Sequence, residues 1–484
     1  MSDNSPHILC VNPWIHDFAA FDFWAKPLGL LQLAAIIRAG GAEVSFLDCL
    51  DRFHPKYLQE IGKKKLKTLD DGRGSFRKRS IPLPNWVEIE AKYISSTEKL
   101  SPEKKRLFLG KSFSRYGVEP DWFRQDLKAL SDKIGAKNGG KFGKPDLILV
   151  TSLMTYWASG VKETISLIKE IFPDTPVVLG GIYATLCTAH AKKNSMADEV
   201  IIRSGEQQIF DIIKKYTGFS LSSTISSIST SPLNLDLLPY PALDLVSRLT
   251  YSPILTSRGC PFTCSYCASS FLEPQMRRRS PESVFDEICY WHKNYGVHNF
   301  AFYDDALLID PEKYILPLLD KILSLPLSFY TPNALHIRQM TKDVASMMFK
   351  TGFKTIRLGL ETTDFSSSRK DDKKVRADEF FYAVGMLKEA GFRQEEIGAY
   401  LLCGLPNQNL DDVEQSIALV KKSGIMPVLA YYTPIPHTPM WQEAVKVSRF
   451  DLENEPFFTN NTLFPCVNSE HDIKKISELK KMAK

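Results

Sequence analysis

Residues 252–267 read SPILTSRGCPFTCSYC. The apolar stretch Ser252 to Thr256 predicts a β-strand, and it runs directly into a loop that carries three cysteines, Cys260, Cys264 and Cys267. Thiolates at this density suit an iron–sulfur cluster or zinc. A zinc site needs a fourth ligand at a short spacing, and the next ones, Cys289 and His292, fall inside a predicted helix. Three cysteines on a cubane cluster leave one iron open, so the loop indicates a reactive centre; a closed zinc site and three buried thiols stay as alternatives.

Downstream of this loop, strand-like apolar runs alternate with helical patterns. Strands are expected at residues 299–303, 327–331, 355–360, 397–402 and 427–433, and helices at 281–295, 311–323, 341–350, 377–390 and 410–423. With the strand at 252–256, the alternation predicts a partial parallel (β/α)6 barrel. Catalytic groups of parallel barrels lie at the carboxyl ends of the strands, which is where the cysteine loop begins.

The N-terminal part shows a shorter alternation. Strands are expected at residues 8–13, 43–48, 146–152, 176–182 and 199–203, and helices at 28–37, 161–172 and 206–216. This predicts an α/β fold that begins with an open, doubly wound parallel sheet. We expect a first domain over residues 1–216 with an insertion at 53–144, a linker at 217–245, the barrel at 246–440 and a C-terminal extension at 441–484.

Composition narrows the setting of the protein. The chain has 484 residues and a formal net charge of +5, too mild to indicate nucleic acid or a membrane surface as a partner. Its nine cysteines are an odd number spread along the chain, with no N-terminal signal pattern and no apolar run of the roughly 18 residues that a membrane span needs. A reducing cytoplasm and no membrane contact are therefore expected.

Positive charge is concentrated in the insertion. Residues 53–144 hold 22 Lys and Arg against 11 Asp and Glu, a surplus of 11, so the rest of the chain carries −6. The runs Lys63 to Lys67 and Arg77 to Arg79 allow a hypothesis of RNA or anionic-substrate binding, while a solvated surface is the default interpretation. Turn-like sequences at 70–74 and 115–117 are candidates for a lid over the site.

The cysteine loop, its place after the first barrel strand and the aromatic Tyr266 before the third cysteine resemble the radical SAM superfamily. The resemblance covers about residues 250–440. It implies that the three cysteines hold a [4Fe-4S] cluster whose open iron binds S-adenosylmethionine (SAM). It also implies that one electron, from a donor such as a flavodoxin or ferredoxin, cleaves SAM to a 5′-deoxyadenosyl radical.

Other strand ends extend the resemblance. Asp304 and Asp305 stand where the family holds the SAM amino group, although a helix N-cap is the simpler alternative. Glu361 ends a segment that resembles the ribose-contacting one, and Arg357 shares its face by strand period, so the two could instead form a structural ion pair. Gly404 to Pro406 and Tyr432 to Pro436 resemble the segments that line the adenine, or are plain exits from strands.

The N-terminal sheet resembles a cobalamin-binding domain. Thr151, Ser152 and Leu153, with Gly180 and Gly181, match the S-x-L and GG elements of that architecture, and glycine there allows a large ligand to approach the backbone. The D-x-H-x-x-G segment that supplies a histidine to cobalt is missing. His16 lies in the corresponding loop and is a candidate ligand, while a solvated or hydrogen-bonded histidine is the simpler interpretation.

These observations predict a radical SAM enzyme with [4Fe-4S], SAM and cobalamin as cofactors, which transfers a methyl group to an unactivated carbon of a small-molecule or peptide substrate. A cobalamin-independent rearrangement or cyclisation and a non-enzymatic iron–sulfur carrier are the alternatives. Cys466 is a candidate hydrogen-atom donor or covalent acceptor, or simply a structural thiol.

Overall fold

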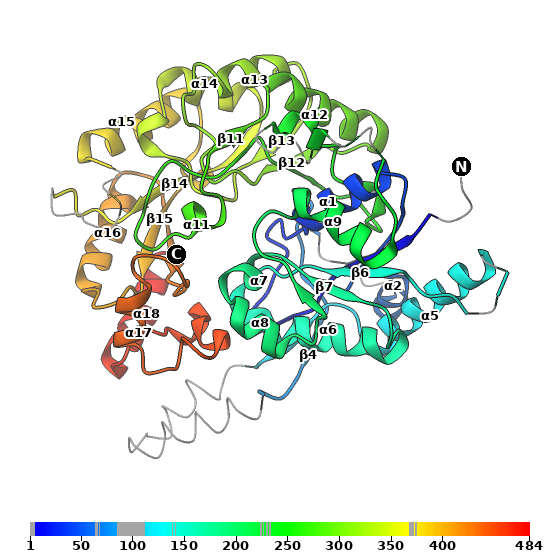
Figure 1. The fold of residues 1–484 in the computed structure, drawn as a ribbon. Coiled ribbons are helices and arrows are strands. Elements are labelled where there is room, and N and C mark those ends of the chain that lie inside the picture. The colour runs from blue at the N-terminus through cyan, green and yellow to red at the C-terminus, as the bar shows by residue number, and fades with distance from the viewer. Residues whose placement is uncertain are drawn as a thin grey trace.

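The computed structural model describes residues 5–62, 66, 68–84, 112–137, 139–140, 142–222, 225, 227–228, 231, 234–366, 372 and 375–484. Two parallel sheets, one near each end of the chain, organise the molecule and lie in two lobes side by side (Figure 1).

The first sheet is open, and its five strands are all parallel in the order β3-β1-β6-β7-β8. The strands are β1 (His7–Asn12), β3 (Glu43–Asp48), β6 (Leu147–Val150), β7 (Val177–Leu179) and β8 (Glu199–Val200). Side chains alternate between two cores. Leu9, Val11 and Ile148 face one, while Ile8 and Leu149 face the other. Both faces are therefore covered, as a doubly wound sheet requires.

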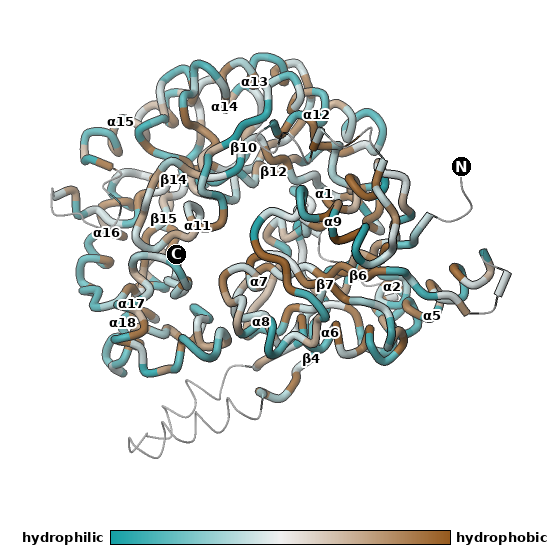
Figure 2. The backbone as a smooth tube through the Cα atoms, in the orientation of Figure 1, coloured by the Kyte–Doolittle hydropathy of each residue, from teal (hydrophilic) through white to brown (hydrophobic). Residues whose placement is uncertain are grey.

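Helices from separate parts of the chain cover these two faces. One face carries α1 (Leu28–Ala39) and α9 (Gly205–Thr217), and the other carries α5 (Pro120–Lys137), α6 (Ala158–Ile171) and the short α7 (Ile182–Leu186) and α8 (Thr188–Asn194). The tube is brown, hence apolar, where β6 and β7 run through the middle of this lobe (Figure 2).

The second sheet has six parallel strands in the order β16-β15-β14-β13-β12-β9, so the predicted partial barrel is confirmed. Its strands are β9 (Ser252–Ile254), β12 (Asn299–Phe302), β13 (Ser328–Tyr330), β14 (Phe353–Glu361), β15 (Ile397–Cys403) and β16 (Met426–Tyr431). Its helices are α12 (Pro281–Tyr295), α13 (Ile315–Ile322), α14 (Lys342–Lys350), α15 (Ala377–Ala390) and α16 (Leu410–Lys422). They form an arc around the sheet (Figure 1).

Local chemistry explains why the barrel helices begin and end where the sequence predicts. The Ser280 hydroxyl accepts the N–H of Ser283 at 3.2 Å, Pro281 occupies the first turn, and Gly296 ends α12 with a φ of 65°. Its predicted bounds, 281–295, agree with the structure.

Antiparallel elements were missed. A three-stranded sheet of β2 (Ile15–Asp17), β5 (Ser114–Tyr116) and β4 (Lys78–Ser80) lies beside the first domain, and α2 (Pro55–Ile61) falls between β2 and β4 in the chain. The insertion also contributes α5, whose Phe123 and Leu127 lie in the core of the first domain. The described part of the insertion is thus partly core. The antiparallel strands were missed because strands of three residues are too short to show a period in the sequence.

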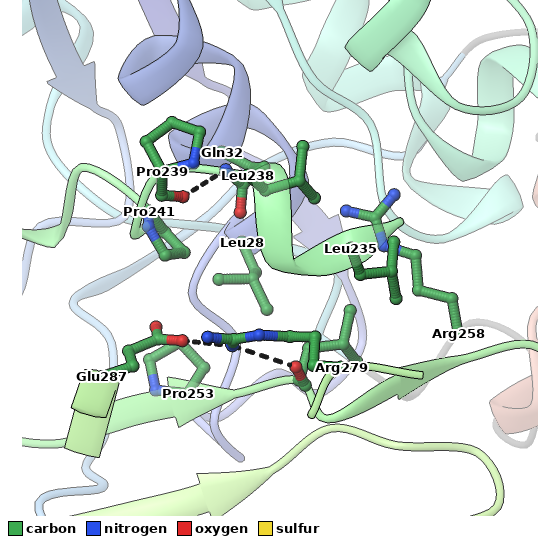
Figure 3. Close-up of a pocket in the computed structure, with 11 residues that line it drawn as sticks. Leu28, Gln32, Leu235, Leu238, Pro239, Pro241, Pro253, Arg258, Arg279 and Glu287 are labelled. Carbon is green, nitrogen blue, oxygen red and sulfur yellow. Dashed lines mark hydrogen bonds and ion pairs between the residues drawn. The ribbon is translucent and has the colours of Figure 1, made fainter. Parts of the chain in front are cut away.

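The linker crosses from the first domain to the barrel over a small pocket of about 30 Å³ (Figure 3). There the Gln32 amide of α1 donates to the carbonyl of Pro239 at 2.7 Å, and the Arg279 guanidinium pairs with Glu287 of α12. The pocket lining includes Leu235 and Pro241, so it is a packed joint between the domains.

The C-terminal extension contains α17 (Trp441–Val447), the short η7 (Pro456–Thr459) and η8 (Asn461–Leu463), and α18 (Glu470–Met482). It returns to the first domain, where Thr459 contacts the Thr155 hydroxyl at 2.8 Å and the Asn460 amide donates to Asp17 at 2.9 Å. Among the described residues, none of the helices combines the length and apolar composition that crossing a bilayer requires.

Candidate functional site

The three predicted cluster cysteines lie in one loop between β10 (Ser257–Arg258) and the short helix α11 (Ser269–Leu272). Gly259, directly before Cys260, has a φ of 81°, and a Cβ there would lie 2.9 Å from the carbonyl oxygen of Gln275. Glycine is therefore required for the loop to pass its hairpin partner β11 (Arg277–Arg278). Cys264 is buried, and Cys260 and Cys267 are half-buried.

The thiols lie close enough to influence one another. Burial is the main cause that raises the pKa of Cys260 to about 11, and Asp305, Cys267 and Cys264 contribute smaller parts of that rise. Over the described ranges, no three His, Cys, Asp or Glu side chains converge on a single point. In a cubane cluster, each of the three thiolates would bind a different iron.

His336 is a neighbour of this loop that the sequence reasoning missed. Its Nε2 lies 3.9 Å from the sulfur of Cys260, and its ring packs against Phe262 with centroids 4.2 Å apart. His336 follows β13 and lies 76 residues after Cys260 in the chain, so no local motif could indicate the contact.

The structure separates the roles of Asp304 and Asp305. The Asp304 carboxylate is buried and accepts the N–H groups and hydroxyls of Thr256 and Ser257, at 2.6 to 3.2 Å. It fixes the strand exit that leads to the cysteines and caps no helix, because the next helix begins at Ile315. Asp305 accepts the Ser269 hydroxyl at 2.9 Å, and Ser269 in turn lies 3.3 Å from the sulfur of Cys267.

The expected alternation along β14 fails at its end. The register with β15 shifts between Gly359 and Glu361, and Glu361 has a φ of 66°, so Glu361 and Arg357 do not share a face by simple period. The Arg357 guanidinium donates to the backbone carbonyls of Ile356 and Glu396, at 3.0 and 3.5 Å. Arg357 therefore does not form the structural ion pair with Glu361 that was the alternative interpretation.

Tyr266 and Glu361 line one cavity of about 300 Å³ at the strand ends. The Tyr266 hydroxyl lies 3.5 Å from Asp372, and burial, Glu361 and Cys264 raise its pKa. Gly404, with a φ of 88°, donates its N–H to Gln408, and the loop it starts supplies Leu405 to Asn409 to the cavity wall. A cavity beside the cysteine loop thus collects Glu361 and Leu405 to Pro406 from the segments expected to contact an adenosine, whereas Gly404 and residues 432–436 are not among its lining residues.

A larger cavity, about 450 Å³, lies between the two domains. The first domain contributes Thr151, Gly180 and Gly181, and the barrel contributes Ser269 and Asp305. Apolar side chains of both covering helices and of the sheet line its inner part: Leu30, Leu33, Leu149, Val178, Ile209 and Ile212. The volume is in the range of ligand sites, and the cavity joins the sheet motif to the cysteine loop.

Two glycines of the sheet motif act differently. Gly181 has a φ of 99°, and a Cβ there would lie 2.3 Å from the carbonyl oxygen of Ser152, so its own turn requires glycine. Around Gly180 no atom lies within 4 Å of a built Cβ, so this glycine leaves open space. Ser152 donates to the Gly180 carbonyl at 2.7 Å and shapes the turn, and neither Ser152 nor Leu153 is among the lining residues.

His16 lies in β2, away from the cavity lining. It is buried, with Nδ1 3.2 Å from the Ser159 hydroxyl and Nε2 2.8 Å from Glu163, which also pairs with Arg115 at 2.6 Å. Burial lowers its pKa although Glu163 opposes this. The hydrogen-bonded interpretation holds, and His16 is not placed to bind cobalt in the cavity.

Cys466 lies in an aromatic cluster with Trp441 and Phe457, against which Tyr266 packs. Burial, with a smaller effect of Glu443, raises its pKa to about 12. The thiol is absent from the cavity lining near Tyr266, so packing is its observed role and its reactivity remains a prediction.

The basic insertion is only partly described, and Lys63 to Lys65 and Lys67 lie outside the described residues. Arg77 pairs with Glu60 and Glu119 at 3.1 and 2.6 Å. The suspected lid at 70–74 is fixed between the domains, because Gly72 accepts from Arg52 and Thr250, and Asp70 accepts from Asn299.

Comparisons with known proteins agree with this geometry. Residues 254–420 match the radical SAM superfamily. The chain is 26% identical over 366 residues to an uncharacterized methyltransferase of Pyrococcus horikoshii, an alignment that covers 70% of this chain and 78% of the relative.

Two solved structures share the fold across both domains. TsrM of Kitasatospora setae, a radical SAM methyltransferase solved with tryptophan substrate and a SAM analogue, is 14% identical, covers 99% of this chain and 90% of its own, and has a TM-score of 0.61. OxsB, a cobalamin-dependent SAM radical enzyme solved with aqua-cobalamin and SAM, is 12% identical, covers 99% and 62%, and has a TM-score of 0.53.

Proposed function

The chain carries a radical SAM domain over residues 254–420 and is an enzyme of that superfamily, and from this premise we propose that it is a cobalamin-dependent methyltransferase. The observation that carries the proposal is the cavity of about 450 Å³ in which the sheet motif faces Gly259 and Ser269, the residues on either side of the three cysteines. The similarity to a methyltransferase of Pyrococcus horikoshii supports it, and so does the fold that this chain shares with the cobalamin-dependent enzyme OxsB.

When bound, a [4Fe-4S] cluster with SAM supplies a 5′-deoxyadenosyl radical, and methylcobalamin supplies the methyl group. Cys260, Cys264 and Cys267 would hold the cluster, and Asp304 positions their loop through Thr256 and Ser257. Tyr266 and Glu361 would bound the adenosine on the side of the 300 Å³ cavity. A flavodoxin or ferredoxin would deliver the electron.

The first domain would bind the corrinoid. Its apolar inner wall, including Leu149 and Ile209, suits the flat base of a nucleotide tail, and the open space at Gly180 leaves room for it. No histidine is among the cavity's lining residues in the described part of the chain. Cobalamin would therefore sit here without a protein imidazole on cobalt.

Anaerobic reconstitution with iron and sulfide, followed by dithionite and SAM, tests the radical chemistry. We expect 5′-deoxyadenosine, and its absence from a fully loaded protein would overturn this part of the proposal.

Chromatography after incubation with hydroxocobalamin tests the corrinoid. We expect corrin absorbance to co-elute with the protein, and the reduced cobalt to give an electron paramagnetic resonance signal without nitrogen coupling. Nitrogen coupling would contradict the ligand assignment, and no co-elution would contradict cobalamin binding as a whole.

A further inference from the structure

His336 faces the sulfur of Cys260, one of the three thiolates that would hold the cluster. Its Nε2 lies 3.9 Å from that sulfur, a long hydrogen bond to an atom larger than oxygen, and its ring packs against Phe262 with centroids 4.2 Å apart. The backbone N–H of Phe262 also hydrogen-bonds the same sulfur. Cys260 thus has a backbone donor and an imidazole nitrogen beside it.

The backbone on both sides of His336 is fixed. Leu335, the residue before it, donates its N–H to the carbonyl of Arg357 at 2.7 Å and accepts the N–H of Gly359 at 3.0 Å, which ties the segment to β14. Ile337, the residue after it, is 2% exposed and lies in the core of the barrel. The half-buried imidazole between these two anchors therefore has few other positions to adopt.

The nitrogen that faces Cys260 is placed as a donor to the sulfur and not as a ligand of the iron that this sulfur binds. An iron held by Cys260 in a cubane has its remaining positions filled by sulfides, so it has no place for an imidazole. Bound to iron, the sulfur of Cys260 is a thiolate that has lost its proton and can only accept a hydrogen bond. The ring nitrogen that faces it must therefore carry a hydrogen, as Nε2 does in one tautomer of the neutral imidazole.

We propose that His336 donates an N–H···S hydrogen bond to the Cys260 thiolate and thereby raises the reduction potential of the cluster. Hydrogen bonds to the sulfurs are among the factors that determine this potential. One-electron reduction increases the negative charge on the thiolate, so a donor stabilises the reduced state more than the oxidised state. His336 is a positioning residue, since it acts through Cys260. The proposal depends on the [4Fe-4S] cluster of the proposed function and not on cobalamin or methyl transfer.

The test is a redox titration of the full chain after anaerobic reconstitution, without SAM. Dithionite supplies one electron per cluster in the presence of mediators, and electron paramagnetic resonance measures the reduced form. His336→Phe keeps a ring against Phe262 and removes the donor, so we expect the equilibrium constant for reduction to fall about tenfold, as loss of one hydrogen bond to a charged group does. A tenfold fall is a potential more negative by about 59 mV for one electron.

Two further variants control for other effects of the change. His336→Gln keeps an N–H that can reach the thiolate and should recover part of the loss. His298→Phe changes an exposed histidine directly before β12, at the amino end of that strand, and is the matched control, with the wild-type potential expected. Iron and sulfide contents are measured for every variant, so that potentials are compared at equal loading of the cluster.

A measurement on the wild type does not depend on how the variants load. With histidine labelled with ¹⁵N, pulsed electron paramagnetic resonance of the reduced cluster should show one weak nitrogen coupling, as expected across a hydrogen bond, and His336→Phe should lose it. A strong coupling, which indicates an Fe–N bond, or no coupling would overturn the proposal, as would equal potentials in the wild type and His336→Phe. A potential that depends on His336 in a protein that forms no 5′-deoxyadenosine would support this inference and contradict the proposed radical chemistry.

Discussion

Single residues decide whether the cysteine loop can hold iron. Cys260→Ala removes one of three thiols that lie near one another, so we expect loss of the cluster from the reconstituted protein. Cys289→Ala removes a half-buried thiol of α12 and is the matched control. Iron and sulfide content with the visible spectrum measures both. Equal loss in the two variants, or none in Cys260→Ala, would show that the loop does not ligate the cluster.

Asp48 is a residue whose protonation affects stability. Burial, with Asp51 as the next cause, raises its pKa from 3.8 to about 6. The native state then binds this proton more tightly than the unfolded state, so stability falls as pH rises from about 4 to about 6. Asp48→Asn cannot ionise, and its stability relative to the wild type should increase across that window. Urea midpoints at about pH 4 and about pH 8 measure this; an equal difference at both would contradict it.

At the scale of elements, the turn after β7 depends on two neighbouring glycines with different requirements. Gly181→Ala places a Cβ 2.3 Å from the Ser152 carbonyl at a φ of 99°, so we expect a loss of about 1–3 kcal/mol or more in unfolding free energy. Gly180→Ala meets no atom within 4 Å and should fold normally while filling the cavity edge. Urea unfolding compares the stabilities of the two variants, and titration with hydroxocobalamin compares their binding at the cavity edge. Equal stabilities would contradict the strain assigned to Gly181.

At the scale of the whole molecule, a buried ion pair joins the two domains. Arg258 of β10 and Glu206 of α9 are 13% and 11% exposed and lie 2.5 Å apart. Burial opposes ionisation of Glu206, yet Arg258 lowers its pKa. Because Glu206→Gln leaves the buried Arg258 with only Glu273, 4.0 Å away, as an ionic partner, we expect a loss of about 3 kcal/mol.

The exposed pair of Arg38 with Asp244 of the linker is the control for that change, since Asp244→Asn should cost less than about 1 kcal/mol. Because the pKa of Glu206 is lowered, the wild-type advantage over Glu206→Gln should shrink as pH falls through the ordinary range of a glutamate. Chemical denaturation at several pH values measures both; similar losses in the two variants would show that burial of the pair contributes nothing.

Much of this architecture could be predicted from local patterns. Apolar periodicity, proline at helix starts and glycine at helix ends depend on neighbours in the chain, so the order of strands and helices and even the bounds of α12 and α15 were recoverable. The spacing of Cys260, Cys264 and Cys267 is equally local, and it indicated the radical SAM superfamily that residues 254–420 match.

Contacts between distant segments were beyond such reasoning. The use of Asp304 as a clamp on Thr256, the neighbourhood of His336 and Cys260, and the bulge that turns Glu361 out of register each depend on packing across the sheet. A small pocket lined by Lys26 and Arg52 likewise needs the ends of β1 and β3 to meet residues 246–251, which lead into β9. The local sequence determines which helices and strands form. Burial of polar groups and uncompensated charge arise only when those elements pack, because desolvation and ion pairing depend on what surrounds each group in space.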